Sequence, residues 1–181
     1  MIFGESNLNI LKRIKNIIYR KFAWWCINKR YAGCRKFKLK RQLLIQAGYK
    51  IGENTKIVGP MFVSAELEIG NNCFIGKDFQ AQGNGKIKIE DNCDIGPNVI
   101  INTGGHNVGT KERRAGEGLI TNITIGSGTW VGLRSTILNN TIIGKNNVIA
   151  AGSVVINSSN DNVLLAGVPA KEKKVYENLD E

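Results

Sequence analysis

Residues 125–155 read IGSGTW VGLRST ILNNTI IGKNNV IAAGSV V when the sequence is divided into units of six. An aliphatic residue opens every unit, at Ile125, Val131, Ile137, Ile143, Ile149 and Val155. A period of six matches neither the 3.6-residue period of an α-helix nor the two-residue alternation of a strand. It indicates a solenoid, in which each unit supplies one short strand and one corner. Stacked turns then bury the aliphatic residues in a column that no single turn could bury alone.

The fourth position of the units supports this interpretation, because Asn, Gly or Asp recurs there. Across the chain these residues are Asn54, Asn72, Asp78, Asn84, Asn92, Asn98, Gly104, Gly128, Asn140, Asn146 and Gly152. They enter the left-handed backbone region at the lowest cost, which a tight corner repeated every six residues requires. Pro60, Glu66 and Arg134 are the exceptions.

The units form two arrays, which together predict about five turns. The first array runs from Ile51 to His106 and shifts by two residues at Ile87–Lys88, where we expect an outward bulge. The second array runs from Ile123 to Val155. Between them the polar segment NVGTKERRAGEGLITN (107–122) predicts a loop that leaves one corner. Insertions of this kind on a solenoid are typical of the binding face.

The net charge of +10 over 181 residues is unevenly distributed. Residues 1–41 contain 12 Lys and Arg with Glu5 as their one acid, which gives +11. The remaining residues contain 13 Lys and Arg against 14 acids, which gives −1. We therefore divide the chain into a basic helical head (1–48), a β-solenoid (49–160) and a C-terminal tail (161–181).

The head predicts two helices, over residues 7–31 and 35–47, with Gly33 between them and Gly48 after the second. In the first helix Leu11, Ile14, Ile18, Phe22 and Trp25 follow an amphipathic spacing. Such a basic helix suits an anionic membrane surface, whereas no apolar run is long enough to span a membrane. Alternatively, its apolar face caps the open end of the solenoid, and both interpretations can hold together. Nucleic acid is not an expected partner, because no binding motif accompanies the charge.

Four cysteines, Cys26, Cys34, Cys73 and Cys93, show no metal-binding spacing. Cys73 and Cys93 occupy the same position of their units, so we expect adjacent reduced thiols in the core. No signal peptide is evident, which indicates a cytoplasmic protein, with peripheral contact at the inner face of the plasma membrane if the head binds lipid. The tail is predicted to be a short helix from about Glu172.

His106, the one histidine of the chain, is the candidate catalytic residue. It is the last residue before the repeat fails, and it follows Gly104 and Gly105, which let a ligand or another backbone approach closely. The unperturbed pKa of a histidine lies near neutral pH, as a general base needs. A single histidine on a protein surface usually has no catalytic role. The assignment of His106 therefore depends on its position at the end of the repeat.

At this point the sequence resembles the hexapeptide-repeat acyltransferases, and in particular the maltose, galactoside and capsular polysaccharide O-acetyltransferases. The resemblance rests on His106, Arg113 seven residues later, and ITIGSGTWVG from Ile123, together with AAGSVV (150–155) and AGVPAK (166–171). It covers about residues 48–174. It implies a left-handed parallel β-helix with N-terminal helices and a homotrimer that binds substrates between subunits.

The resemblance also implies direct acetyl transfer from acetyl-CoA to a carbohydrate hydroxyl, without a metal. His106 would remove the proton of the acceptor hydroxyl. The residues expected to bind CoA are Trp130, Gly132, Ala151, Lys171 and Lys174. Lysines on a tail are often only solvated charges, and Trp130 is equally suited to packing in an interface. Gln82 and Arg113 are the candidates for acceptor binding, although the alignment of Gln82 crosses a gap.

Two departures from the family concern substrate binding. Ile156 and Asn157 stand where relatives often carry a Thr-Lys pair that contacts CoA, and the basic head replaces the acceptor-binding N-terminal segment of the maltose and galactoside enzymes. The head therefore favours an enzyme of capsule, exopolysaccharide or lipopolysaccharide biosynthesis. The alternatives are a sugar-nucleotide N-acetyltransferase and, less favoured, an inert β-helix scaffold. A carbonic anhydrase of this fold needs three histidines, which the chain lacks.

Overall fold

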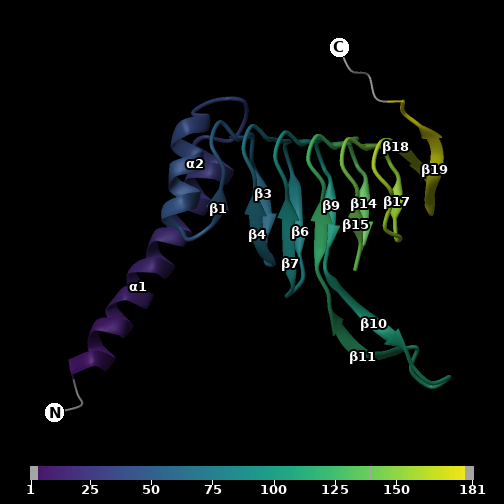
Figure 1. Cartoon of the computed structure of the whole chain (residues 1–181). Coiled ribbons are helices and arrows are strands. Elements are labelled where there is room, and N and C mark those ends of the chain that lie inside the picture. Colours follow the sequence, from purple (N-terminus) through teal and green to yellow (C-terminus); the bar gives the residue numbers. More distant parts are fainter. Residues whose placement is uncertain (1–3, 139, 178–181) are drawn as a thin grey trace.

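The units of six form three parallel sheets that wrap into a three-sided coil (Figure 1). The structure, a computed structural model, describes residues 4–138 and 140–177. The first sheet contains β1 (Lys50–Ile51), β4 (Glu66–Ile69), β7 (Lys86–Ile89), β12 (Ile123–Ile125) and β15 (Ile142–Ile143). The second contains β2 (Lys56–Ile57), β5 (Phe74–Ile75), β8 (Asp94–Ile95), β13 (Trp130–Val131), β16 (Val148–Ile149), β18 (Val163–Gly167) and β19 (Ala170–Val175). The third contains β3 (Met61–Val63), β6 (Phe79–Gln82), β9 (Ile100–Asn102), β14 (Thr136–Leu138) and β17 (Val154–Val155).

Each turn visits the three sheets in the same order, so every strand pairs in parallel with the strand one turn later. Ile51 pairs with Ile69, for example, and Ile57 pairs with Ile75. Five complete turns are followed by β18, which pairs with β16 and begins a sixth. The predicted left-handed parallel β-helix is confirmed, with about six turns where the sequence predicted about five.

The residues that open the units form the core. Ile125, Val131, Ile137, Ile143, Ile149 and Val155 each expose at most 1% of their surface. Cys73 and Cys93 are buried among them as free thiols. Because no turn can bury its apolar residues alone, the stability of each turn depends on its neighbours.

Most predicted corner residues have the left-handed conformation. Positive φ angles occur at Asn54, Asn72, Asp78, Asn92, Asn98, Gly128, Asn140, Asn146 and Gly152. Arg134 also has a φ of 57°, although arginine carries no intrinsic preference for this region. The geometry of the corner therefore decides the conformation there. At Asn84 and Gly104 the expectation fails, since the positive φ lies at Gly83 and Gly104 belongs to a strand.

The two-residue bulge was predicted at the wrong place. Ile87 and Lys88 lie inside β7 and pair regularly with Leu67 and Glu68. The separation between paired residues is 18 at Met61 and Phe79 but 20 at Leu67 and Ile87. The extra residues therefore lie in the corner between β6 and β7. Four residues separate Ala81 from Lys86, whereas two separate Val63 from Glu66 one turn earlier, and no strand is interrupted.

The predicted loop between the arrays leaves the coil as expected, and it forms a β-hairpin that the sequence did not indicate. β10 (Gly104–Val108) and β11 (Ala115–Ile120) pair antiparallel and project from the coil (Figure 1). Outside the coil no neighbouring turn is available to this segment, and its backbone groups pair with each other across two strands. The sequence shows no apolar alternation because neither face of the hairpin is buried in the chain.

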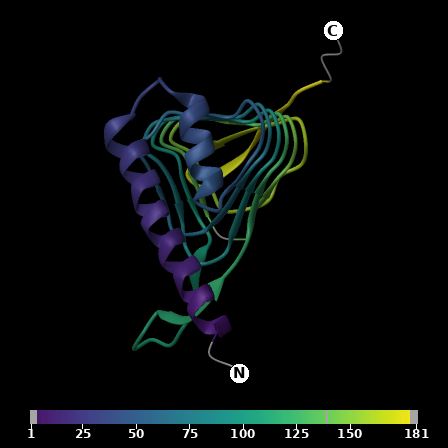
Figure 2. The same cartoon turned by 90° about the vertical axis from the view of Figure 1, so that its left-hand side faces the viewer.

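The head covers the open end of the first turn (Figure 2). It contains α1 (Gly4–Trp25), a π-helical turn η1 (Cys26–Arg30) and α2 (Phe37–Gln46), close to the predicted helices. Ala23, Ile27 and Leu44 are buried in the same apolar cluster as the solenoid core. Among the described residues no helix is long and apolar enough to cross a bilayer.

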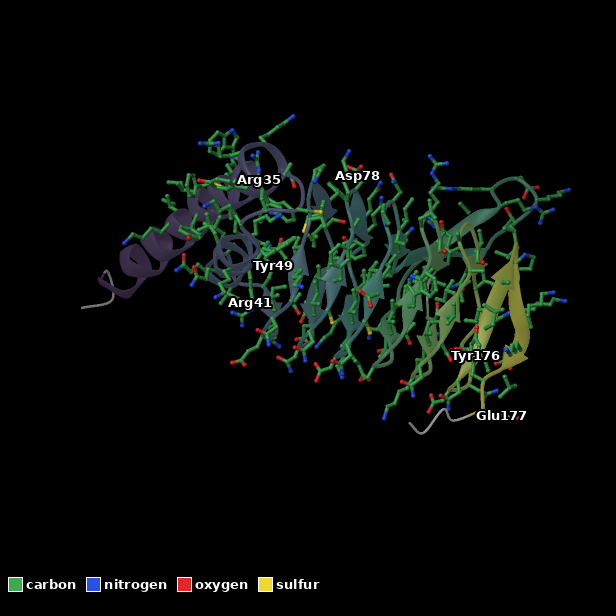
Figure 3. The ribbon with its side chains drawn as sticks, turned by 90° about the horizontal axis from the view of Figure 1, so that it is seen from above. Arg35, Arg41, Tyr49, Asp78, Tyr176 and Glu177 are labelled. Atoms are coloured by element: carbon green, nitrogen blue, oxygen red, sulfur yellow. The ribbon has the colours of Figure 1, made fainter. Side chains whose placement is uncertain are left out.

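Three side chains of the head bind backbone groups of the first turn. The Asn28 amide donates to the carbonyl oxygen of Met61 (3.0 Å) and accepts from its N–H (2.9 Å), as a neighbouring strand would. Lys40 Nζ donates to the Val58 carbonyl (2.7 Å), and Arg41 Nε donates to the Gly52 carbonyl (2.6 Å). The head therefore caps the solenoid, which was one of the two roles considered for it. Figure 3 shows Arg41 at this end of the molecule and Tyr176 at the other.

The prediction of a helical tail from Glu172 is wrong for the described residues. Ala170–Val175 form β19, which pairs antiparallel with β18. β18 is the last parallel strand of the second sheet, and without β19 one edge of β18 would expose unpaired backbone groups to solvent. Pairing at the end of the sheet outweighs the helix propensity of the lysines and glutamate in this segment. The last predicted tail residues, 178–181, lie outside the described residues.

Candidate active site

His106 lies in the hairpin that leaves the third sheet. β9 ends at Asn102, and the chain continues through Thr103 into β10, where His106 pairs with Gly118 of β11. Its side chain is exposed. The residue is therefore carried beyond the body of the coil, on a two-stranded support.

A backbone contact fixes the orientation of the His106 ring. Its Nδ1 lies 2.9 Å from the carbonyl oxygen of Gly116 on β11. A carbonyl oxygen can only accept a hydrogen bond, so Nδ1 carries the proton. In the neutral ring Nε2 is then the unprotonated nitrogen and can accept a proton from a bound hydroxyl. This is the tautomer that a general base needs.

Two threonines anchor the base of the hairpin to the coil. The buried Thr103 hydroxyl donates to the Gln82 carbonyl (3.2 Å) and accepts from the Gly85 N–H (3.0 Å). On the returning strand, the Thr121 N–H (3.1 Å) and hydroxyl (2.8 Å) both donate to the Thr103 carbonyl. These bonds hold the hairpin, and hence His106, against the third turn.

Gln82 lies close to this anchor. It is the residue of β6 that pairs with Asn102 of β9, and both side chains are half-buried on the outer face of the third sheet. The Gln82 amide donates to Gln80 Oε1 (2.6 Å), while Asn102 Oδ1 accepts from the Gly104 N–H (2.9 Å). The arrangement places a polar patch of three amides, Gln80, Gln82 and Asn102, beside the start of the hairpin at Gly104.

Arg113 is placed differently. It lies between β10 and β11 at the outer end of the hairpin, where its side chain is exposed. The separation of seven residues from His106 does not make the two neighbours, because His106 pairs with Gly118. The structure therefore separates Arg113 from the Gln82 patch.

The candidates for CoA binding gather on another side of the coil. Trp130, Val148, Leu164 and Lys174 are in register across four strands of the second sheet. At about 4.8 Å between strands, this row places Lys174 roughly 14 Å from Trp130. Beside Trp130 lies an open hollow of about 310 Å³, lined also by Phe74, Asp94, Ile95 and Gly96.

Gly132 and Ala151 lie at the corner beside this row. A Cβ atom at Gly132 would lie 2.6 Å from the Ala151 nitrogen, so only glycine allows the two turns to stack there. Lys171 pairs with Ala166, and both Lys171 and Lys174 are exposed on β19. The candidates form a strip with an aromatic ring at one end and two cations at the other. The strip consists of Trp130, Gly132, Ala151, Lys171 and Lys174. An elongated ligand with an anionic end, such as CoA, suits this chemistry.

Within one chain the strip and His106 lie apart. The strip follows the second sheet and its corner with the third, whereas the hairpin leaves from the far end of the third sheet. The hairpin also points away from the coil (Figure 1). It exposes 87% of Val108 and 69% of Ile120.

Sequence reasoning missed the residues that position His106. Thr103 and Thr121 contribute contacts at the base of the hairpin, and Gly116 contributes its carbonyl oxygen from β11. No local pattern marks such contacts. Asn102 could have been found, because it lies one turn after Gln82 once the two-residue insertion is counted. The cluster of metal-binding side chains that a metalloenzyme would need is not found among the described residues.

Comparisons with known proteins agree with this geometry. The family model described as the hexapeptide repeat of succinyl-transferase matches residues 122–156. The galactoside O-acetyltransferase of Escherichia coli K12 is 37% identical over 139 residues, which cover 73% of this chain and 66% of that enzyme. The chain spans 60–66% of the length of this and two other curated relatives, among them the galactoside O-acetyltransferase of Lactococcus lactis.

Solved structures are similar over a larger part of the chain. A galactoside acetyltransferase in complex with coenzyme A superposes with a TM-score of 0.75 at 26% identity, covering 92% of this chain and 83% of that one. A maltose O-acetyltransferase from Clostridium difficile 630 gives a TM-score of 0.74 at 26% identity, with 91% and 88% covered. The likeness therefore includes the head as well as the repeats.

Proposed function

We propose that this chain, which belongs to the hexapeptide-repeat acyltransferase family, transfers an acetyl group from acetyl-CoA to a hydroxyl group of a sugar. The observation that carries the proposal is the fixed ring of His106. Its Nδ1 is held by the Gly116 carbonyl, which leaves Nε2 free to accept a proton. An inert scaffold would have no need for a histidine in this tautomer on a projecting hairpin.

In this reaction His106 acts as the general base. Nε2 takes the proton of the acceptor hydroxyl while the oxygen attacks the thioester carbonyl of acetyl-CoA. The tetrahedral intermediate then collapses, the carbon–sulfur bond breaks, and the imidazolium returns its proton to the CoA thiolate. General-base help of this kind typically contributes 10²–10⁴ in rate. The sugar leaves as an acetate ester, and no metal takes part.

We assign the strip on the second sheet to CoA. Trp130, Gly132 and Ala151 would contact the pantetheine arm, and Lys171 and Lys174 would contact the phosphates. Support comes from the register of Trp130 and Lys174 on one outer face and from the CoA-bound galactoside acetyltransferase of similar fold. The nucleotide end of CoA is anionic, so the two lysines belong at its end of the strip.

We further propose that the active enzyme is a homotrimer in which the hairpin of one subunit reaches the strip of the next. The support is the separation of His106 from the strip within one chain. A neighbouring subunit would also cover Val108 and Ile120, the exposed apolar residues of the hairpin. Two different faces meet in such a contact, and a rotation that closes after three copies gives a ring.

The acceptor is proposed to be a carbohydrate of the cell surface, as in capsule, exopolysaccharide or lipopolysaccharide biosynthesis. Gln82 is assigned to acceptor binding, with Asn102 added because it lies beside Gln82. Arg113 is also assigned to the acceptor, which it would reach from the outer end of the hairpin and not from the Gln82 patch. The basic head favours an acceptor that is assembled at the cytoplasmic side of a membrane. Acetyl-CoA would be available on that side.

A thiol-release assay tests the proposal. The full chain is incubated with acetyl-CoA and with galactosides, maltose or fragments of surface polysaccharides, and free CoA is measured. We expect release that depends on a hydroxyl acceptor, with an ester product that mild alkali cleaves. An alkali-stable amide formed only from amino sugars would instead establish N-acetyl transfer. Binding of acetyl-CoA without turnover on any acceptor would contradict the enzyme assignment.

A further inference from the structure

The two faces of α1 have different surroundings. Ala23 is buried against the core, and Cys26 and Ile27 of the following turn continue this contact. Ile18 lies five residues before Ala23 and therefore on the opposite side of the helix. Only the C-terminal end of α1 belongs to the cap, and the remainder leaves the solenoid (Figures 1 and 2).

The face opposite the cap is apolar and exposed. Ile14, Ile17, Ile18, Phe22 and Trp25 expose between 47% and 63% of their surfaces. We call these five residues the apolar stripe. The spacing of four, four and three between Ile14, Ile18, Phe22 and Trp25 puts them along one side of the helix. The amphipathic spacing also predicted Leu11 on this face, but its side chain is not among those that the structure describes.

The charge around the stripe is strongly positive. Lys15 and Lys21 are exposed on the same helix, and Lys29, Lys36 and Lys38 are exposed in the rest of the head. Arg20 is different, because it is engaged with the Tyr49 hydroxyl at 3.0 Å. Glu5 is the one acid in residues 1–41, so the head carries +11.

We propose that the apolar stripe of α1 docks on the surface of an anionic lipid bilayer, with the helix lying in the interface. Apolar side chains enter the acyl boundary while lysines meet the lipid phosphates, as in other interfacial helices. The lysine stems are long enough to reach the headgroups from beside the stripe. The cap and the membrane contact are therefore made by opposite faces of one helix.

A second copy of the chain fits the stripe less well. Pairing two stripes would bring two segments of +11 together, and like charges at close range repel. The remainder of the chain carries a net charge of only −1, so its overall charge does not offset this repulsion. An anionic bilayer supplies both the apolar layer and the opposite charge.

The direction of α1 connects this contact with catalysis, a consequence that rests on the proposed function. In both views the free end of α1 and the β10–β11 hairpin extend to the same side of the solenoid, the lower side of Figures 1 and 2. His106 is therefore carried on the side toward which the free end of α1 extends. An acceptor sugar attached to a membrane docked on α1 would enter the site from that side.

Vesicle sedimentation tests the docking without using activity. The full chain is mixed with vesicles of phosphatidylcholine containing 30% phosphatidylglycerol, and with vesicles of phosphatidylcholine alone. We expect strong binding to the anionic vesicles. The double variant Ile18→Ser/Phe22→Ser should bind them at least tenfold more weakly. Lys15→Gln/Lys21→Gln should also bind more weakly, by about fivefold for each lysine.

The matched control is Phe62→Ser/Ile142→Ser, which removes the same residue types at 55% and 62% exposure from the solenoid. It should bind vesicles as the unchanged chain does. The proposal is overturned if the full chain does not sediment with anionic vesicles, or if the stripe variant and the control bind alike. It is also overturned if the stripe variant loses oligomer mass in light scattering, because the stripe would then join copies of the chain. None of these results depends on acetyl transfer.

Discussion

The β10–β11 hairpin and the helical head both depart from the six-residue repeat, but they are attached to the coil in different ways. The head buries Ile27 and Leu44 in the common core and binds the first turn through Asn28. The hairpin adds nothing to that core and is held by hydrogen bonds at Thr103 and Thr121. The head therefore belongs to the folding unit, whereas the hairpin is free to carry chemistry. Changes in the hairpin should alter rate, and changes in the head should alter stability.

The largest effect is expected at the hairpin. His106→Ala should lower kcat by about 10²–10⁴, because general-base help is lost. The free energy of unfolding should change by less than about 0.5 kcal/mol, since the side chain is exposed. Calorimetry should give an unchanged affinity for acetyl-CoA. Asn107→Ala, the exposed neighbour, is the control, and near-normal turnover by folded His106→Ala would refute the assignment.

In the head, Ile27→Ala should lower the free energy of unfolding by about 2–4 kcal/mol, because it leaves a cavity in a fully buried site. Turnover per folded molecule should stay the same. Ile17→Ala removes the same atoms from the exposed face of α1 and should change stability by less than about 0.5 kcal/mol. Urea unfolding measures both variants. Equal stability losses would mean that α1 and the following turn η1 do not present one common face to the core.

The head should also give stability a particular pH dependence. Burial lowers the pKa of Lys40 to about 8, from 10.5. Between these values the unfolded chain binds more protons than the folded chain, so this lysine makes stability rise with pH. We expect a gain of about 2 kcal/mol from pH 8 to pH 10.5.

Lys40→Met should lack this gain, so the informative quantity is the stability difference between the unchanged chain and Lys40→Met at each pH. Well below pH 8 that difference should be constant, because Lys40 is then protonated in both states. The hydrogen bonds of Lys40 Nζ to the Gly33 and Val58 carbonyls are lost in the variant, which makes it less stable at every pH. A difference that does not change across the whole range would contradict the lowered pKa.

The smallest effect is expected for the apolar residues of the hairpin. Val108→Ser/Ile120→Ser should leave the stability of the single chain unchanged, since both side chains are exposed. If the hairpin contacts a neighbouring subunit, the variant should weaken trimer formation by about five- to thirtyfold. Sedimentation equilibrium measures this change. Unchanged association would remove the hairpin from the interface.

The repeat could be predicted because it is local. The aliphatic residues from Ile125 to Val155 specify the coil by spacing alone, and the corner residues follow from backbone sterics. Arg134 shows the limit of residue preference, because the stacked corner imposes a left-handed conformation on it. The position of the two-residue insertion was missed because Ile87 and Ile89 are both aliphatic. The repeat can therefore resume at either residue without breaking the pattern of buried positions.

The structural features that the sequence did not predict depend on contacts between distant parts of the chain. The tail near Glu172 has a helical composition but becomes a strand because β18 offers an unpaired edge. His106 was identifiable as a candidate, whereas the Gly116 carbonyl that sets its tautomer belongs to a strand that the sequence does not indicate. Nor does any pattern in the head predict that Asn28 binds Met61, 33 residues away.

The Asn28 contact has a consequence for how the protein behaves in concentrated solution. A parallel coil can in principle continue indefinitely, and an uncovered first turn would present the same backbone groups that the last turn of another molecule could bind. Asn28, Lys40 and Arg41 occupy those groups with side chains. At the other end β19 runs antiparallel and interrupts the stacking direction. The two ends thereby prevent head-to-tail polymerisation into fibres and keep the solenoid at a fixed length.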